Sequence, residues 1–298
     1  MRTLLLSLKM LRRDLRAGEL NLLVLALLLA VTALSSVAFL NERVAQGLKR
    51  DASQLLGGDL LITADHALPP RFAEQARASG LRLTRTVTFN SMASTETAAQ
   101  LAAVKAVESA YPLRGSLQLG GVAGEPGREA GRIPAQGEAW VDETLLSALQ
   151  LKLGERLQLG YLDLRIGAVI RFESDRGMGF SSLAPRVMIN ALDLPASGLI
   201  QEGSRAHYRL QLAGAGKAVR VYEAWVASRL GRGERLESLD NARPEIRMAL
   251  DRAGRFLRLT AMLSVVLAAV AIGLSSRRYL RRHINPCAVM RCFGARRG

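Results

Sequence analysis

Two charge-free apolar stretches stand out in the pattern of hydrophobic and polar positions along the chain. The first covers residues 20–41 between two glutamates, and the second covers residues 259–276 between two arginines. At about 1.5 Å per residue, the first helix is long enough to cross about 30 Å of hydrocarbon, and the second lies near the lower end of the spanning range. The pattern predicts two transmembrane helices. A cleavable signal peptide is the alternative for the first stretch and a buried core helix for the second.

Helical periodicity also precedes the first apolar stretch. Residues 1–19 place leucines on one stripe, with basic side chains that include Arg12, Arg13 and Arg16 on its flank. This arrangement is typical of an amphipathic helix that lies in the membrane interface with its cations toward lipid phosphates. An ordinary solvated helix is the alternative.

The two spans are predicted to continue as stalks into the segment between them. Helical periodicity follows the first span as far as Gly57-Gly58, a helix C-cap signal, and a second helical pattern opens at Pro244 and meets no stop before Arg277. One face of the second span carries small side chains, which allow close helix packing: Ser264, Ala268, Ala271 and Ser275. Generic small-residue content is an equal alternative for this face.

Residues 42–258 alternate short strand patterns with helix patterns, which predicts an α+β domain with a mixed α/β part and a β-rich part, inserted between the two spans. The expected strands are 59–63, 81–89, 99–107, 139–141, 156–159, 162–172, 186–190 and 206–212. The expected helices are 70–78, 143–149 and 217–230, the second with Asp142 as its N-cap. The glycine-rich segment 120–137 is expected to be a mobile loop.

The net charge of +15 is concentrated outside the two apolar stretches. Residues 1–19 hold five basic and two acidic side chains, and residues 277–298 hold seven arginines and no acid. The positive-inside rule therefore places both termini in the cytoplasm and residues 42–258 across the membrane. A nucleic-acid-binding tail is the alternative, but arginines beside a span ordinarily hold topology and anionic lipid, so no nucleic-acid partner is expected.

Residue patterns for catalysis are missing, so we expect no enzyme, no cofactor and no metal site. Residues 212–217 resemble a phosphate-binding loop but lack its glycine spacing and its final Ser or Thr. The two cysteines, Cys287 and Cys292, have no third thiolate partner. Acidic pairs such as Asp163 with Glu173 and Glu234 with Glu237 are interpreted as surface charges.

A compact helix signal lies close to the end of the chain. Asn285 is a good N-cap, Pro286 suits the first helical position and Gly294 suits the residue after the end, so 286–294 predicts a two-turn helix. Two turns are unstable alone in water, so this helix needs a surface to dock on. Its members Val289, Met290, Arg291 and Phe293 suit a groove on a cytoplasmic partner, and lipid headgroups are the alternative surface.

Several of these features together resemble permease subunits of the MacB/FtsX-like ABC transporter family. They are the basic N-terminal helix, the two spans around an exported domain, and the tail pattern Pro286-x-x-x-Met290-Arg291-x-x-Gly294. Three further stretches, 111–115 (YPLRG), 137–142 (GEAWVD) and 184–190 (APRVMIN), look like the YbbP-type branch. Family members have four spans, so the resemblance implies that this chain is the N-terminal portion of a longer permease, either a fragment or a truncated reading frame.

The resemblance implies a multi-pass protein of the bacterial inner membrane with a periplasmic middle domain. It implies a separate cytoplasmic ABC ATPase as partner, with residues 286–294 as the coupling helix, contact with membrane lipid, and pairing as a homodimer or with a second permease. ATP hydrolysis is then expected to move the stalks and change the exported domain, for export or extraction of lipid-like, lipoprotein or hydrophobic substrates. A membrane-anchored sensor with an exported ligand-binding domain is the alternative, although the tail has no signalling domain.

Overall fold

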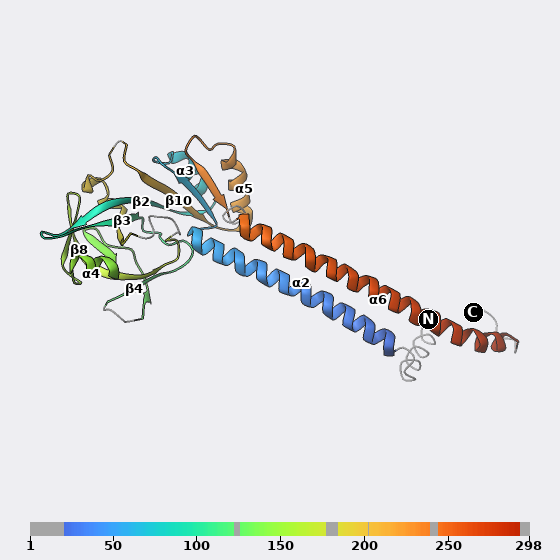
Figure 1. Ribbon diagram of the computed structural model, residues 1–298. Helices are drawn as coiled ribbons and strands as arrows, with labels where there is room; N and C mark the ends of the chain where they lie inside the picture. Colours follow the sequence, from blue (N-terminus) through green and yellow to red (C-terminus); the bar gives the residue numbers. More distant parts are fainter. Residues whose placement is uncertain (1–20, 122–125, 177–183, 202, 239–243, 293–298) are drawn as a thin grey trace. The chain divides into compact units, whose positions relative to one another are not determined.

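The computed structural model describes residues 21–121, 126–176, 184–201, 203–238 and 244–292 (Figure 1). The chain divides into two units. Residues 48–244 form one, which we call the head, and residues 1–47 with 245–298 form the other, which we call the helical unit. The expected interfacial helix 1–19, with Arg12, Arg13 and Arg16, lies outside the described residues.

Two long helices account for the described part of the helical unit. Helix α2 covers Asn21–Leu56, so its last turns belong to the head, and helix α6 covers Pro244–Cys292. The uninterrupted helical patterns expected up to Gly57 and onward from Pro244 are therefore confirmed. Within the described residues, no helix has both the length and the apolar content that crossing a bilayer requires.

The prediction of a separate helix starting at Pro286 is wrong. Helix α6 runs through Asn285 and Pro286 and ends at Cys292, and residues 293–298 lie outside the description. A new helix has to nucleate, whereas extending a formed helix adds one hydrogen bond for each residue that is fixed. Residues 277–284 contain no Gly or Pro, so the existing helix reaches Asn285. It continues through Pro286 at the cost of one backbone hydrogen bond and of crowding between the proline ring and the Arg282 carbonyl.

One part of the head has the split βαβ arrangement of ferredoxin-like folds. Its sheet has the order β11–β1–β10–β2, and all neighbours are antiparallel. The elements are β1 (Leu60–Ala64), α3 (Pro70–Ala78), β2 (Arg82–Ser94), β10 (Ala206–Ala213), α5 (Gly216–Ala227) and β11 (Arg235–Ser238). Along the chain this is β1–α3–β2, a long insertion, then β10–α5–β11. An apolar cluster that includes Phe72, Leu210 and Tyr222 joins the two helices to one face of the sheet.

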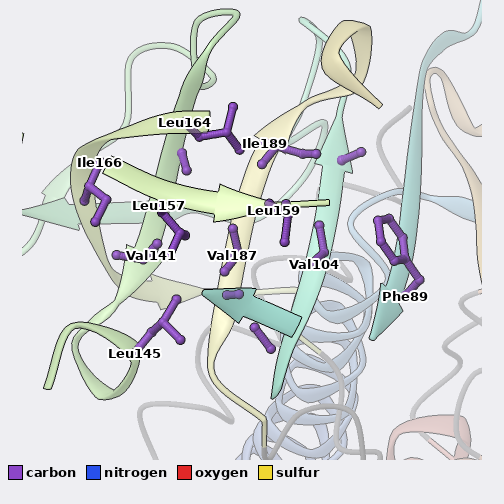
Figure 2. Close-up of a cluster of buried hydrophobic side chains, with 14 of the residues drawn as sticks. Phe89, Val104, Val141, Leu145, Leu157, Leu159, Leu164, Ile166, Val187 and Ile189 are labelled. Atoms are coloured by element: carbon purple, nitrogen blue, oxygen red, sulfur yellow. The ribbon is translucent and has the colours of Figure 1, made fainter. Parts of the chain in front are cut away.

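The insertion between β2 and β10 forms a closed barrel. Its strands pair in the ring β2–β3–β9–β6–β8–β7, and β7 closes the ring by pairing with both β8 and β2. The added elements are β3 (Ala99–Val107), β6 (Glu138–Asp142), β7 (Arg156–Leu159), β8 (Leu162–Glu173) and β9 (Arg186–Asn190). Figure 2 shows the apolar side chains that fill the barrel, including Leu157 and Val187. Strand β2 belongs to both the barrel and the ferredoxin-like sheet.

Helix α4 (Glu143–Leu149) follows β6 and places Leu145 and Leu149 in the barrel core. Asp142 caps it as expected, because its Oδ1 accepts a hydrogen bond from the Leu145 amide at 3.1 Å. Two short 3-10 helices, η2 (Ala191–Asp193) and η3 (Pro195–Ser197), follow β9.

The expected α+β mixture is confirmed, and so are its strands and helices to within a few residues. Three short strands were not expected: β11, β4 (Leu117–Gly120) and β5 (Arg128–Glu129), of which β4 pairs with β8 and β5 with β4. The described part of 120–137 is therefore not simply the loop that was predicted. Ile133 packs on an apolar cluster and Arg132 forms an ion pair with Glu138. The glycine content of this segment gave no indication of these contacts.

Candidate functional site: a buried anchor for the end of α2

Helix α2 ends in a hydrogen-bonded cap inside the head. The Gly58 amide donates to the Ser53 carbonyl at 3.1 Å and the Gly57 amide donates to the Gln54 carbonyl at 3.2 Å, which is the Schellman arrangement. Gly57 has φ +69°, and a Cβ there would lie 2.3 Å from Nε2 of Gln211. The backbone angle therefore favours glycine, a Cβ would in addition have to displace the Gln211 side chain, and the predicted C-cap is confirmed.

Gln211 on β10 connects this helix end to a buried charge. Its Nε2 donates to the Leu56 carbonyl at 3.2 Å and to Oδ2 of Asp175 at 2.7 Å. The Asp59 amide, directly after the cap, donates to the Leu212 carbonyl at 2.7 Å. The end of α2 is thus held by one side-chain bond to its last residue and by the sheet bond that begins β1.

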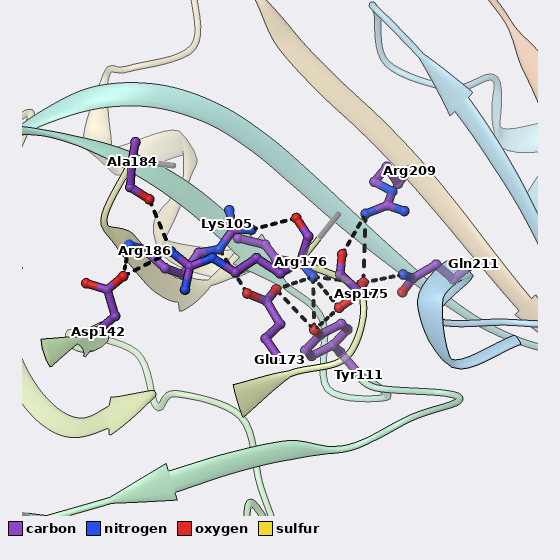
Figure 3. A network of polar contacts seen from close by, with 10 residues as sticks. All are labelled: Lys105, Tyr111, Asp142, Glu173, Asp175, Arg176, Ala184, Arg186, Arg209 and Gln211. Atoms are coloured by element: carbon purple, nitrogen blue, oxygen red, sulfur yellow. Dashed lines mark hydrogen bonds and ion pairs between the residues drawn. The ribbon is translucent and has the colours of Figure 1, made fainter. Parts of the chain in front are cut away.

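Asp175 belongs to a network of charged side chains that we call the buried ionic network (Figure 3). Nζ of Lys105, on β3, lies 2.9 Å from both oxygens of Asp175 and 2.7 Å from Oε1 of Glu173, at the end of β8. Nε of Arg186, at the start of β9, donates to Oε2 of Glu173 at 2.9 Å. The members are Lys105, Tyr111, Glu173, Asp175, Arg186 and Gln211, and they join the barrel to the ferredoxin-like sheet.

The four charged members are almost completely shielded from water. The side chains of Lys105, Glu173, Asp175 and Arg186 are 1%, 0%, 3% and 4% exposed. Two positive and two negative charges face one another, so the network is neutral, as buried charges have to be. Arg209, which is 20% exposed, adds a fifth charge 3.8 Å from Asp175 at the edge of the network.

The environment moves two pKa values in opposite directions. Burial opposes ionisation of Asp175, but the charges of Lys105 and Arg209 outweigh it and hold its pKa below the usual range. Burial, followed by the negative charges of Asp175 and Glu173, raises the pKa of Tyr111 well above its usual value. Tyr111 therefore stays protonated, and its Oη donates to Oδ1 of Asp175 at 2.5 Å.

The polar groups of the network are engaged with one another. The donors of Lys105 are occupied by Asp175, Glu173 and Tyr111, which leaves no free base or nucleophile there. Within the described ranges no group of three or more His, Cys, Asp or Glu side chains could hold a metal ion. What the arrangement can do is to fix the end of α2 relative to the barrel and the sheet.

The sequence interpretation of Glu173 as a surface charge is wrong, because its partners come from distant segments. Glu234 is also buried, with 3% of its side chain exposed, whereas Asp163 is an exposed partner of Arg156. A usable signal was present in β3, where Lys105 interrupts the apolar run AAVKAV. A cation within a buried strand requires a buried anion.

Each of the three stretches that resemble the YbbP-type branch contributes to this region. Tyr111 is a member of the network, and Asp142 Oδ2 accepts from the backbone amide of Arg186 at 2.9 Å, which positions that arginine on Glu173. Arg114, from the first stretch, forms a two-bond ion pair with Asp59, the residue that follows the α2 cap. The three stretches therefore contain residues that belong to the buried ionic network, position one of its members or pair with the residue after the α2 cap.

The site residues expected from the sequence are in the helical unit, not in this anchor. Val289, an expected ATPase contact, is 55% exposed on α6. Pro286, Met290 and Arg291 also lie within α6, whereas Phe293 and Gly294 lie outside the described residues. The four small residues of the expected packing face, Ser264, Ala268, Ala271 and Ser275, are all in α6. Ser264 is half-buried, and its Oγ donates to the Thr260 carbonyl at 3.0 Å.

The chain is similar to a curated relative, the uncharacterized ABC transporter permease YbbP of Escherichia coli (strain K12). The two are 30% identical over 285 residues, which cover 96% of this chain and 34% of the relative. The chain therefore spans about a third of the relative's length. The match confirms the resemblance to ABC transporter permeases, although no protein-family model matches the chain.

Among solved structures, the chain is similar to the periplasmic region of MacB from Actinobacillus actinomycetemcomitans, with a TM-score of 0.42, 12% identity, and coverage of 63% of this chain and 92% of that one. The extracellular domain of the noncanonic ABC-type transporter YknZ from Gram-positive bacteria gives a TM-score of 0.38, 9% identity, and coverage of 60% and 100%. A domain of a putative permease from Porphyromonas gingivalis gives a TM-score of 0.38 and 15% identity, and the match covers 65% of this chain and 97% of that one.

Proposed function

We propose that this chain acts as the permease-type subunit of an ABC transporter, which couples ATP hydrolysis by a separate cytoplasmic ATPase to a conformational change in the head. The similarity to the permease YbbP over 285 residues carries this proposal.

The proposed topology follows from the distribution of charge. Residues 20–41 and 259–276 cross the bacterial inner membrane, basic flanks hold both termini in the cytoplasm, and the head lies in the periplasm. Movement of the spans then reaches the head through the end of α2, where Gln211 and the buried ionic network are attached. We further propose that the head acts on lipid-like, lipoprotein or other hydrophobic substrates and that the subunit pairs with itself or with a second permease.

Co-purification tests the proposed partner. The protein is tagged at its chromosomal locus, extracted in mild detergent and isolated, and bound proteins are identified by mass spectrometry. We expect an ABC ATPase in about equimolar amount. A tagged protein isolated intact and without any ATPase contradicts the proposal and favours the membrane-anchored sensor.

Thiol labelling tests the proposed topology. Cys287 and Cys292 are the only cysteines of the sequence, and Arg128 on β5 is exposed. In spheroplasts, a membrane-impermeant maleimide is expected to label Arg128→Cys, placed in a background without the native cysteines, and to label the native cysteines only after permeabilisation. Labelling of both positions from the same side contradicts the topology.

A further inference from the structure

A hollow of about 350 Å³ lies between helix α4 and strand β8, within the usual size range of ligand sites, about 300–1,000 Å³. Val169 of β8 borders the hollow and pairs with Val141 of β6, one of the side chains that fill the barrel (Figure 2). Paired residues of neighbouring strands point to the same face, so the hollow is on the inner face of the barrel wall. Leu146 and Leu151 also border it and pack on the barrel core. The floor of the hollow is therefore an apolar extension of that core.

The described residues that border the hollow include two cations and one anion: Arg171, Lys152 and Glu143. Arg171 lies two residues after Val169 on β8, so its side chain leaves the same face of the strand. Its Nη1 donates to Oε2 of Glu143, in the first turn of α4, and its side chain is 18% exposed. The ammonium group of Lys152 is exposed and has no ion-pair partner among the described residues. One positive charge at the rim is therefore left uncompensated.

Two glycines leave room for the Arg171 side chain. A Cβ at Gly120, at the end of β4, would lie 2.8 Å from Nε of Arg171, and a Cβ at Gly127 would lie 3.2 Å from the Cβ of Arg171. A larger residue at Gly120 would have to move the guanidinium group. Glycine at these positions thus accommodates a cation on the inner face of the barrel wall.

The backbone of Gln150 is in an unfavourable conformation at the point where it borders the hollow. Its φ is +52°, and it is the left-handed residue after α4, where glycine is the most common residue. A side chain in this region is less stable than glycine, and such positions are concentrated at ligand sites. Glutamine brings amide donors to the rim that glycine lacks.

We propose that this hollow binds a single-chain anionic amphiphile, of which a fatty acid is the simplest example. The acyl chain lies on Leu146, Leu151 and Val169 and is removed from water there. The carboxylate lies at the rim, where the Lys152 ammonium and the Gln150 amide donate to it. The site is a property of the head, and only its use in handling hydrophobic substrates rests on the proposed function.

Photo-crosslinking of the full chain in lipid nanodiscs tests the site. The probe is decanoate with a diazirine on its chain, and decanol with the same diazirine tests the need for the charge. Labelled peptides are identified by mass spectrometry and measured relative to peptides of residues 259–276 in α6. We expect the acid to label peptides that contain 143–152 or 169–171, and the alcohol to label them about threefold less. Equal labelling by the two probes, or labelling of the head only outside these peptides, refutes the site.

Ser147→Trp and Ala148→Trp are a matched pair of substitutions on α4. Both positions are exposed, but only Ser147 borders the hollow. We expect Ser147→Trp to fill the hollow and to lower labelling by the acid about tenfold, whereas Ala148→Trp changes it by less than about twofold. An equal loss in both variants, or no loss in either, contradicts binding in the hollow.

Lys152→Glu tests the recognition of the anion. It is expected to lower labelling by the acid about fivefold while leaving labelling by the alcohol unchanged, a difference that a general loss of structure would not produce. Lys217→Glu, at an exposed lysine on α5, is the matched control and is expected to change neither. Unchanged labelling by the acid in Lys152→Glu refutes the assigned ligand class. The expected labelling without a co-purifying ATPase retains the site and refutes the proposed function, and a co-purifying ATPase without this labelling does the reverse.

Discussion

Lys105→Met is expected to destabilise the head by about 3–5 kcal/mol. The substitution removes the cation that pairs with both Glu173 and Asp175 inside a region that water does not reach. Arg186 still neutralises Glu173, but Asp175 is left with only the more distant and partly exposed Arg209. An uncompensated buried carboxylate must either stay charged at high cost or take up a proton.

Denaturant unfolding followed by tryptophan fluorescence measures this effect, because the two tryptophans of the sequence, Trp140 and Trp225, both lie in the head. Lys152→Met, at an exposed lysine, is the matched control and is expected to change stability by less than about 0.5 kcal/mol. Adding Asp175→Asn to Lys105→Met removes the stranded charge and is expected to restore about 1–3 kcal/mol. A Lys105→Met protein within about 1 kcal/mol of wild type contradicts the structural role of the network.

Val289→Glu is expected to abolish the stimulation of the partner ATPase, with a loss of about tenfold or more. Val289 is 55% exposed on α6 and, under the proposed function, lies in an apolar groove of the ATPase. A glutamate there would have to lose its hydration without a partner. Because glutamate is a good helix former, the helix itself is expected to persist.

ATPase rates of the co-purified complex, with and without the subunit variant, measure the coupling. Ala288→Glu places the same charge on the preceding residue of α6, which is also exposed but lies on a different face, and is expected to keep most of the stimulation. Unchanged stimulation by the Val289 variant, or an equal loss in both variants, contradicts the docking of this helix face.

The strand and helix pattern of the head could be predicted from the sequence because it is a local property. Strands β3, β7 and β9 and helices α3 and α4 have the bounds that alternation, apolar runs and capping residues predict. Asp142 and Gly57 perform the capping roles expected of them, since a cap depends only on residues within one turn. The short strands β4, β5 and β11 escaped prediction because their pairing depends on a distant neighbour rather than on their own composition.

The contacts of the anchor could not be predicted, because its partners are far apart along the sequence. Lys105 meets Glu173 and Asp175 across 68 and 70 residues, and Gln211 meets Leu56 across 155 residues. Such contacts exist only once β7 closes the barrel and β10 returns to pair with β2. A lysine in an apolar strand predicts that a buried anion exists but not which one.

The sequence by itself determined the order of the parts, namely a helical pattern, an α+β segment and a second helical pattern, together with the motifs shared with ABC transporter permeases. These follow from periodicity, charge and short motifs, which are written along the chain. Only the tertiary structure decided that β2 serves two subdomains, that Glu173 is buried, and that Pro286 continues a helix instead of starting one. Burial and strand pairing are properties of the whole packed molecule, so no local pattern contains them.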